Sequence, residues 1–244
     1  MFKLITAEKP KSPIAEAYRT LRTNLQFTAV DGDLKKILIT SAGPNEGKSS
    51  VIANLGITMT QTGKKVLIID ADMRNPTQHK LFSLPNTAGL STVLAMDMEA
   101  DKAWQETPIE DLKILSAGPI PPNPAELLGS KRMKHLLEEV SAQFDMILID
   151  SPPTIAVVDS SVLAQLVDGV ILVLAYGEVN RDYALQAKEQ LDKVKAKILG
   201  TVLNKVEMKS KEHYYYYYYG DKHSHTGQSH KKKKKKKTNT NNIL

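Results

Sequence analysis

Apolar runs of strand length alternate with helical patterns along most of the chain. Six runs predict strands: KKILIT (35–40), KKVLIID (64–70), LKILSAG (112–118), DMILID (145–150), GVILVLA (169–175) and KILGTVLNKV (197–206). Helical patterns cover 48–62, 125–141 and 181–195. Because the strands are apolar on both faces and alternate with helices, they predict an α/β fold, a three-layer domain with a mainly parallel sheet covered on both sides.

Two of the expected helices have recognisable first residues. Ser12 as N-cap and Pro13 in the first turn begin an additional N-terminal helix over 12–27. Asn123 as N-cap and Pro124 at the first position begin the helix that follows them.

The alternation of strands and helices stops after Val206. The segment 207–244 consists mainly of Lys, His, Tyr, Asn, Ser and Thr, and includes an unbroken lysine run at 231–237. Such a composition cannot bury enough apolar surface to offset the entropy of ordering. We therefore expect a folded domain over 1–206 and a disordered tail over 207–244.

The net charge of the chain is +6 at pH 7, and its positive part lies in the tail. The tail contains ten lysines and three acidic residues, whereas residues 1–206 contain 23 basic and 24 acidic side chains. The domain therefore lacks the basic excess of a nucleic-acid-binding protein, and we expect no nucleic-acid partner. The lysine run by itself would attract any polyanion, so RNA and an anionic membrane surface both remain open for the tail.

The chain contains no cysteine, which excludes disulfides, thiolate metal sites and cysteine nucleophiles and suits a reducing compartment. Its first residues, MFKLITAEKPKS, lack the apolar core of a signal peptide. No apolar run approaches the roughly 18 residues that are needed to span a bilayer. We therefore expect a cytosolic protein.

The segment SAGPNEGKSS (41–50) connects a predicted strand to a predicted helix and fits a P-loop in which Ala42 replaces the first Gly. In a P-loop, backbone N–H groups surround the β-phosphate, the lysine reaches the β- and γ-phosphate oxygens, and the Ser hydroxyl binds Mg²⁺. The loop residues expected to contact the nucleotide are Ala42, Gly43, Pro44, Asn45, Glu46, Gly47, Lys48, Ser49 and Ser50.

Two other motifs place carboxylates at the ends of predicted strands. Asp70 and Asp72 in VLIIDADMR are two residues apart, so at the end of an extended strand they point the same way. Asp150 ends the apolar run of MILIDSPP, as does a Walker B carboxylate that holds Mg²⁺, commonly through water. Because ligands bind at the carboxyl edge of such sheets, these carboxylates and the P-loop predict a nucleotide-dependent phosphoryl-transfer site.

Together, SAGPNEGKSS, VLIIDADMRNP and ILIDSPP resemble the Walker A, A′ and B motifs of the bacterial tyrosine kinases that regulate capsular and exopolysaccharide assembly. The similarity runs from about Ser12 to Asn204 and includes PPNPAELL (121–128). It implies a P-loop protein-tyrosine kinase that depends on ATP and Mg²⁺. The partition and division-site ATPases of the same P-loop branch have a signature lysine where this chain has Gly43, which favours the kinase. An ATP-switched positioning or partition-type ATPase scaffold remains the alternative.

The resemblance assigns roles to the motif residues. Lys48 and Ser49 would hold ATP and Mg²⁺, and Asp72 and Asp150 would complete the metal site. Asp70 would be the candidate base, and with Asp72 and Lys48 it would form the catalytic set. Because tyrosine has a pKa of about 10, a carboxylate that accepts its proton during transfer is useful.

Three other positions also receive expectations. Arg74 either stabilises charge on the phosphates or pairs with a neighbouring acid. Asn204, at the end of the last strand, either hydrogen-bonds adenine as in related P-loop ATPases or caps a turn. Asn45 stands where the family often has Gly, and we expect the loop to close normally because Asn tolerates positive φ.

Glu16, Arg19 and Arg22 are spaced by three residues in EAYRTLR and therefore lie along one side of the predicted N-terminal helix. A solvated charged face is one interpretation. The resembled family carries a Glu-x-x-Arg-x-x-Arg motif here that joins neighbouring subunits, so the resemblance implies a homo-oligomeric ring.

Six consecutive tyrosines stand in the tail: Tyr214, Tyr215, Tyr216, Tyr217, Tyr218 and Tyr219. Nucleic-acid stacking surfaces interleave aromatic and basic residues, whereas this run is unbroken. The resembled kinases carry phosphoacceptor tyrosines at the C-terminus, so the run is expected to be phosphorylated. An extended chain from Val206 would reach roughly 27 to 45 Å at about 3.4 Å per residue, which allows phosphorylation in trans within a ring.

The resemblance also implies partners. They are a transmembrane polysaccharide co-polymerase that activates the kinase, a cognate phosphotyrosine phosphatase and further copies of the chain. The chain resembles the split form of the family, in which the activator recruits a cytoplasmic kinase to the inner face of the plasma membrane.

Overall fold

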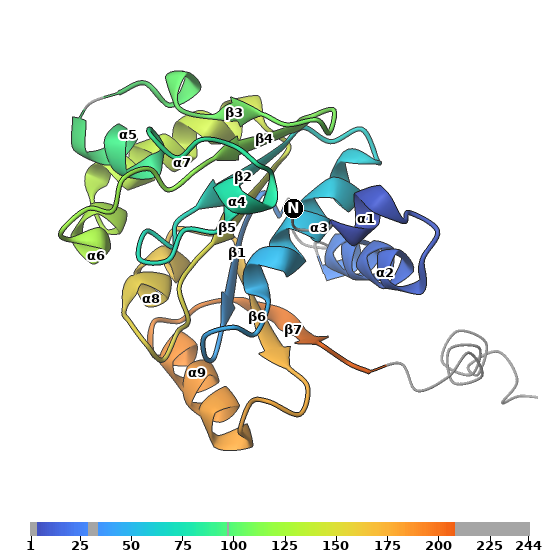
Figure 1. The fold of residues 1–244 in the computed structure, drawn as a ribbon. Coiled ribbons are helices and arrows are strands. Elements are labelled where there is room, and N and C mark those ends of the chain that lie inside the picture. The colour runs from blue at the N-terminus through green and yellow to red at the C-terminus, as the bar shows by residue number, and fades with distance from the viewer. Residues whose placement is uncertain (1–3, 29–33, 97, 208–244) are drawn as a thin grey trace, which may run out of the picture. The chain divides into compact units, whose positions relative to one another are not determined.

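A seven-stranded sheet with helices on both faces forms the centre of the compact unit Met1–Val206 (Figure 1). The computed structural model describes residues 4–28, 34–96 and 98–207. The expected disordered tail, with its tyrosine and lysine runs, lies outside the described residues apart from Glu207. Within the described residues no helix is long and apolar enough to cross a membrane.

The sheet has the strand order β3-β4-β2-β5-β1-β6-β7. All neighbouring strands are parallel except β3 and β4, which pair antiparallel at one edge. The strands are β1 (Lys36–Ser41), β2 (Val66–Asp70), β3 (Gln105–Glu106), β4 (Leu112–Leu115), β5 (Met146–Asp150), β6 (Gly169–Ala175) and β7 (Ile198–Asn204). The six predicted strands are therefore present. The sheet also contains the two-residue strand β3, which was not predicted.

Register brings the predicted carboxylates together. Asp70 at the end of β2 lies beside Asp150 at the end of β5, with their Cα atoms paired across the sheet. The neighbouring strand β1 runs parallel to β5 and leads into the P-loop. The three motifs therefore meet at the carboxyl edge of three adjacent strands, as expected for an open α/β sheet.

The helices vary more in length than the sequence pattern indicates. They are α1 (Ile5–Glu8), α2 (Pro13–Thr28), α3 (Lys48–Thr60), α4 (Gln78–Leu81), α5 (Leu90–Met96), the 3₁₀ helix η1 (Ala100–Lys102), α6 (Pro124–Leu128), α7 (Lys131–Gln143), α8 (Asp159–Ala164) and α9 (Arg181–Lys193). The short helices α1, α4, α5, α8 and η1 were not predicted, because one or two turns give too few residues to establish a period.

The single helix predicted over 125–141 is wrong, because α6 ends at Leu128 and α7 begins at Lys131. Ser130 caps the second helix, since its hydroxyl accepts a hydrogen bond from the Met133 N–H at 3.2 Å. Asn123 precedes α6 but makes no side-chain cap bond, and its amide instead donates to Glu126 Oε2 at 3.1 Å. At the N-terminus, the expected cap is present: Ser12 Oγ accepts from the Ala15 N–H at 3.2 Å.

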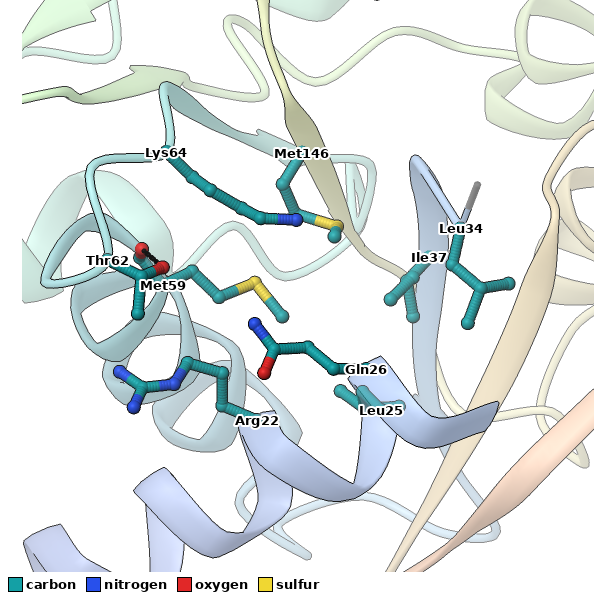
Figure 2. A pocket seen from close by; sticks show the side chains of 9 residues that line it. All are labelled: Arg22, Leu25, Gln26, Leu34, Ile37, Met59, Thr62, Lys64 and Met146. Atoms are coloured by element: carbon teal, nitrogen blue, oxygen red, sulfur yellow. Dashed lines mark hydrogen bonds between the residues drawn. The ribbon is translucent and has the colours of Figure 1, made fainter. Parts of the chain in front are cut away.

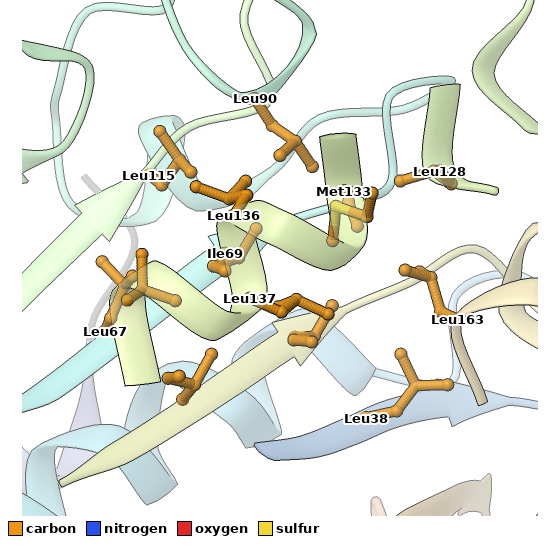
Figure 3. Close-up of a cluster of buried hydrophobic side chains, with 14 of the residues drawn as sticks. Leu38, Leu67, Ile69, Leu90, Leu115, Leu128, Met133, Leu136, Leu137 and Leu163 are labelled. Carbon is orange, nitrogen blue, oxygen red and sulfur yellow. The ribbon is translucent and has the colours of Figure 1, made fainter. Parts of the chain in front are cut away.

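Each face of the sheet supports its own hydrophobic layer. On β1, Leu38 faces the layer formed with α5, α6, α7 and α8, whereas Ile37 and Ile39 face the layer formed with α2 and α3. Figure 3 shows the first layer, in which Leu136 and Leu137 of α7 pack over the sheet. The central strands are buried on both sides, which explains why they are apolar except at their ends.

The helix α3, which follows the P-loop, is fixed by a buried polar contact to α1. Asn54 Oδ1 accepts hydrogen bonds from the Thr6 N–H at 3.1 Å and the Thr6 hydroxyl at 2.8 Å. The Asn54 amide donates to the Ser50 carbonyl at 2.8 Å. Thr6 and Asn54 are both buried, so these groups depend on each other for hydrogen bonds.

Replacing Asn54 with Ala should lower the free energy of unfolding by about 1 to 3 kcal/mol, because two buried donors of Thr6 lose their acceptor. Urea denaturation followed by circular dichroism measures this change. Thr6→Ser keeps both donors and should remain within about 0.5 kcal/mol of the unchanged chain. Equal stability of Asn54→Ala and the unchanged chain would contradict the assigned role of the contact.

Candidate active site

The P-loop connects β1 to α3 with two residues in the left-handed region. Asn45 has a φ of 62° and Gly47 a φ of 85°. The loop therefore closes with Asn45 in the positive-φ conformation expected for it. A Cβ atom on Gly47 would lie 2.2 Å from Asn204 Nδ2, so glycine is required here both by φ and by space.

Two side chains hold the P-loop from the side of the domain. Glu46 is only 4% exposed, and its carboxylate accepts hydrogen bonds from the backbone N–H groups of Gly43 and Ala175, the latter at 2.8 Å. Asn204 Nδ2 donates to the Glu46 carbonyl at 2.9 Å. These contacts attach the loop to the ends of β6 and β7 and shape it for a ligand on its other side.

Lys48 lies between two carboxylates at the first turn of α3. Its Nζ is 2.8 Å from Asp72 Oδ2 and 3.4 Å from Asp150 Oδ1. Burial alone would lower the pKa of Lys48, but the charges of Asp150 and Asp72 raise it above its ordinary value. Lys48 is therefore a protonated ammonium, as a phosphate-binding lysine must be.

Asp70 is completely buried behind this ion pair. Its Oδ2 accepts hydrogen bonds from the N–H groups of Thr77 and Gln78, both at 2.9 Å, and its Oδ1 accepts a longer one from the Asp72 N–H at 3.3 Å. Burial and the nearby Asp150 charge raise the pKa of Asp70 to about 8, although the two backbone donors oppose this rise. Asp70 can therefore take up a proton close to neutral pH.

Arg74 pairs with an acid, which is one of the two expectations for this residue. Its Nε donates to Asp159 Oδ2 at 2.9 Å and its second guanidinium nitrogen donates to Asp159 Oδ1 at 3.1 Å. Asp159 is fully buried at the start of α8, and this bidentate pair raises the pKa of Arg74. The pair ties the loop after β2 to the segment after β5.

Two residues of the site were missed by the sequence analysis, namely Asp159 and Gln78. Gln78 is completely buried, and its Nε2 donates to Asp150 Oδ2 at 2.7 Å and to the Ser49 carbonyl at 3.2 Å. Neither residue belongs to a motif or ends a predicted strand, so no local signal could have marked it.

The donor set fits Mg²⁺ held jointly with a nucleotide. Among the described residues, no three His, Cys, Asp or Glu side chains form a group that would hold a metal on their own. Mg²⁺ usually binds through one or two carboxylates, several waters and substrate phosphates. Ser49 Oγ and Asp72 Oδ2 both lie near Lys48 Nζ, at 3.4 and 2.8 Å from it, and the buried Asp150 Oδ1 accepts no hydrogen bond from the described residues. Ser49, Asp72 and Asp150 therefore suit the metal predicted for them.

A cavity of about 520 Å³ adjoins the P-loop at this edge of the sheet. It is formed by the P-loop, the segment after β5 and the start of α9, and it is lined by Ala42, Gly43, Pro44, Asn45, Glu46, Ile155, Ala156, Glu178, Val179, Asn180 and Tyr183. Another cavity, of about 320 Å³, lies at the opposite edge, where Ile37 and Met146 begin their strands (Figure 2). Of these two cavities, the larger is therefore the one that the P-loop lines.

The N-terminal helix makes contacts within its own chain. Arg19 pairs with Glu16 at 2.6 Å and also donates to the Pro10 carbonyl. Arg22 donates to the Thr58 carbonyl of α3 at 2.5 Å. It also lines the second cavity, together with Gln26 and Lys64 (Figure 2). The three charged residues thus lie along α2 as expected, but Arg22 is partly used to fasten α2 to α3.

The chain is similar to known proteins over most of its length. The ParA family model, described as NUBPL iron-transfer P-loop NTPase, matches residues 34–239. The tyrosine-protein kinase YwqD of Bacillus subtilis is 47% identical over 86% of this chain and 89% of its own length. The tyrosine-protein kinase CpsD of Streptococcus agalactiae is 37% identical over 78% of this chain and 82% of its own length.

The solved kinase domain of the Escherichia coli tyrosine kinase ETK has the same fold. It matches with a TM-score of 0.82 at 33% identity, covering 86% of this chain and 83% of that one. The family assignment made from the three motifs is therefore confirmed. The chain belongs to the bacterial tyrosine kinases, within the ParA-type P-loop NTPases.

Proposed function

We propose that this chain is an ATP- and Mg²⁺-dependent protein-tyrosine kinase that phosphorylates the tyrosines 214–219 of neighbouring copies and thereby regulates capsular or exopolysaccharide synthesis and export. The observation that carries the proposal is the contact of the P-loop lysine, Lys48, with both Asp72 and Asp150 at one sheet edge. This arrangement occurs in a chain 47% identical to a tyrosine-protein kinase.

In the proposed reaction, Lys48 releases its carboxylate partners and binds the β- and γ-phosphate oxygens of ATP. Ser49, Asp72 and Asp150 would hold Mg²⁺, which would neutralise charge on the transferred phosphoryl group. The tyrosine oxygen forms a bond to the γ-phosphorus as the bond to the ADP oxygen breaks. The phenolic proton passes to Asp70, whose location beside Asp72 suits it to this role.

Asp70 Oδ1 is the oxygen better suited to accept that proton. Its 3.3 Å contact to the Asp72 N–H is longer than the two 2.9 Å bonds at Oδ2. Burial and the Asp150 charge raise the pKa of Asp70 to about 8, so the carboxylate form that can accept the phenolic proton is increasingly populated as the pH rises toward and above 8. Oδ2 meanwhile keeps the carboxyl group oriented through the start of α4.

The partners implied by family resemblance belong to this proposal. A transmembrane polysaccharide co-polymerase would activate the kinase and recruit it from the cytoplasm to the inner face of the plasma membrane. A cognate phosphotyrosine phosphatase would reverse the modification. The ring would bring the tail of one subunit to the P-loop of the next.

Incubation of the full-length chain with Mg²⁺ and ATP, with and without the activator's cytoplasmic segment, should add phosphate to the tyrosines 214–219. Phosphate sites are mapped by mass spectrometry. Lys48→Met should reduce incorporation by about 100-fold or more, because it removes the cation that stabilises the transferred group. A chain that ends at Val206 should accept none on a tail but should still phosphorylate a tail peptide.

Hydrolysis of ATP with unmodified tyrosines in both conditions would instead support the positioning-type ATPase scaffold. That alternative shares the fold, but the chain has Gly43 in place of its signature lysine.

Replacing Asn204 with Ala should weaken ATP binding about fivefold, the effect of losing a hydrogen bond worth about 1 kcal/mol. The contact of Asn204 with the Glu46 carbonyl predicts that ATP and GTP are weakened equally, since the loop that holds phosphates is loosened. Equilibrium binding of both nucleotides measures the effect. A loss confined to ATP would show that Asn204 contacts adenine.

Replacing Arg19 and Arg22 together with Ala should convert the ring to monomers, as measured by size-exclusion chromatography with light scattering. Lys102→Ala provides the matched control, because Lys102 is an exposed cation paired with Glu99 in another part of the domain. Because Arg22 also fastens α2 to α3, the double variant is first checked for an unchanged thermal midpoint. If the double variant folds and its assembly is unaltered, the proposed role of Arg19 and Arg22 in the subunit interface is contradicted.

A further inference from the structure

Gln78 connects the three motifs of the site. Its Nε2 donates to Asp150 Oδ2 at 2.7 Å, at the end of β5. The same nitrogen donates to the Ser49 carbonyl at 3.2 Å, in the first turn after the P-loop. Its backbone N–H donates to Asp70 Oδ2 at 2.9 Å, at the end of β2. One residue at the start of α4 thus contacts all three predicted motifs.

The orientation of the Gln78 amide follows from its partners. The Asp150 carboxylate and the Ser49 carbonyl are both acceptors, so the NH₂ group of the amide must face them. The side chain is completely buried, so water does not compete for these bonds in the folded domain. The amide is therefore held in one orientation by two acceptors that belong to separate parts of the chain.

Asp150 uses its two oxygens differently as a result. Oδ2 is occupied by Gln78, whereas Oδ1 faces Lys48 Nζ at 3.4 Å and accepts no hydrogen bond from the described residues. A carboxylate held by one oxygen cannot rotate freely about its terminal bond. The free oxygen is therefore presented toward the P-loop lysine.

We propose that Gln78 is a positioning residue that fixes the Asp150 carboxylate so that Oδ1 is directed toward the Mg²⁺–nucleotide complex. This inference rests on the proposed function of the site, because it deepens the role of Asp150 as a metal-site carboxylate. Gln78 acts only through Asp150 and Ser49. Partners that orient a metal ligand typically change metal affinity 10- to 100-fold when they are removed.

The test compares the full-length chain with Gln78→Met, which has a side chain of similar length without a donor. Binding of fluorescent N-methylanthraniloyl-ADP is measured as Mg²⁺ is titrated, and again in EDTA. The variant should need about tenfold more Mg²⁺ for half of the metal-dependent gain in binding. Its affinity for the nucleotide in EDTA should stay within about twofold of the unchanged chain, because the contacts of the P-loop with Ala175 and Asn204 are kept.

Gln105→Met is the matched control. Gln105 lies in β3, and its Nε2 donates to the Pro85 carbonyl and to Ser116 Oγ, both at 3.1 Å and both outside the site. Its Mg²⁺ requirement should equal that of the unchanged chain. Gln78→Asn is a second variant, used if Gln78→Met does not fold. It keeps a polar amide on a side chain that is one methylene shorter, so the amide no longer reaches the same acceptors. This variant should also raise the Mg²⁺ requirement.

An unchanged Mg²⁺ requirement in a folded variant would overturn the proposal. Equal weakening with Mg²⁺ and in EDTA would also overturn it, because that result indicates general loosening of the loop. The readout does not depend on phosphoryl transfer. If the chain binds Mg²⁺ and nucleotide but does not modify tyrosine, the proposed kinase function is contradicted. The proposed role of Gln78 is not contradicted by that result.

Discussion

The ammonium group of Lys48 lies between two buried carboxylates at the sheet edge and offsets their charge. Asp72 and Asp150 lie within ion-pair distance of its Nζ, and both are almost inaccessible to solvent. An unpaired buried charge is costly, so the three groups stabilise one another or shift their protonation. Asp70, which has no cation within ion-pair distance among the described residues, is the carboxyl group whose pKa rises. The position of one cation thus separates Asp72 and Asp150, which pair with it, from Asp70.

This arrangement also determines what a nucleotide must do to bind. The phosphates of ATP offer Lys48 new negative partners, and a divalent cation offers the two carboxylates a new positive one. In the loaded site, Lys48 would pair with the phosphates, and Asp72 and Asp150 would pair with the divalent cation. No buried charge would then be left unpaired. Both the cation and the lysine would then stabilise charge on the transferred phosphoryl group.

Most of the residues that shape the site are not the ones that would touch the ligand. Glu46 and Asn204 fix the P-loop from behind, Gln78 fixes Asp150, and Asp159 fixes Arg74. Each bond joins segments that are far apart in the sequence. Within the P-loop itself, Glu46 adds to this support because its carboxylate accepts a hydrogen bond from the Gly43 N–H. Glu46 shows the difference most clearly, because it belongs to the motif but faces the domain.

The sequence by itself determined six of the seven strands, the P-loop and the three aspartates, because apolar runs and short motifs are local signals that survive in any context. It placed Asp70 and Asp150 at one edge, since parallel strands end together. It did not reveal the break at Ser130, because the pattern of apolar residues continues through it. Only the tertiary structure decided that Arg74 pairs with Asp159, that Asn204 supports the P-loop and that Gln78 joins the three motifs. Apart from the Gln78–Asp70 bond, which spans 8 positions, these contacts link residues between 29 and 158 positions apart. Such partners are chosen by the packing of whole elements rather than by any pattern within one segment.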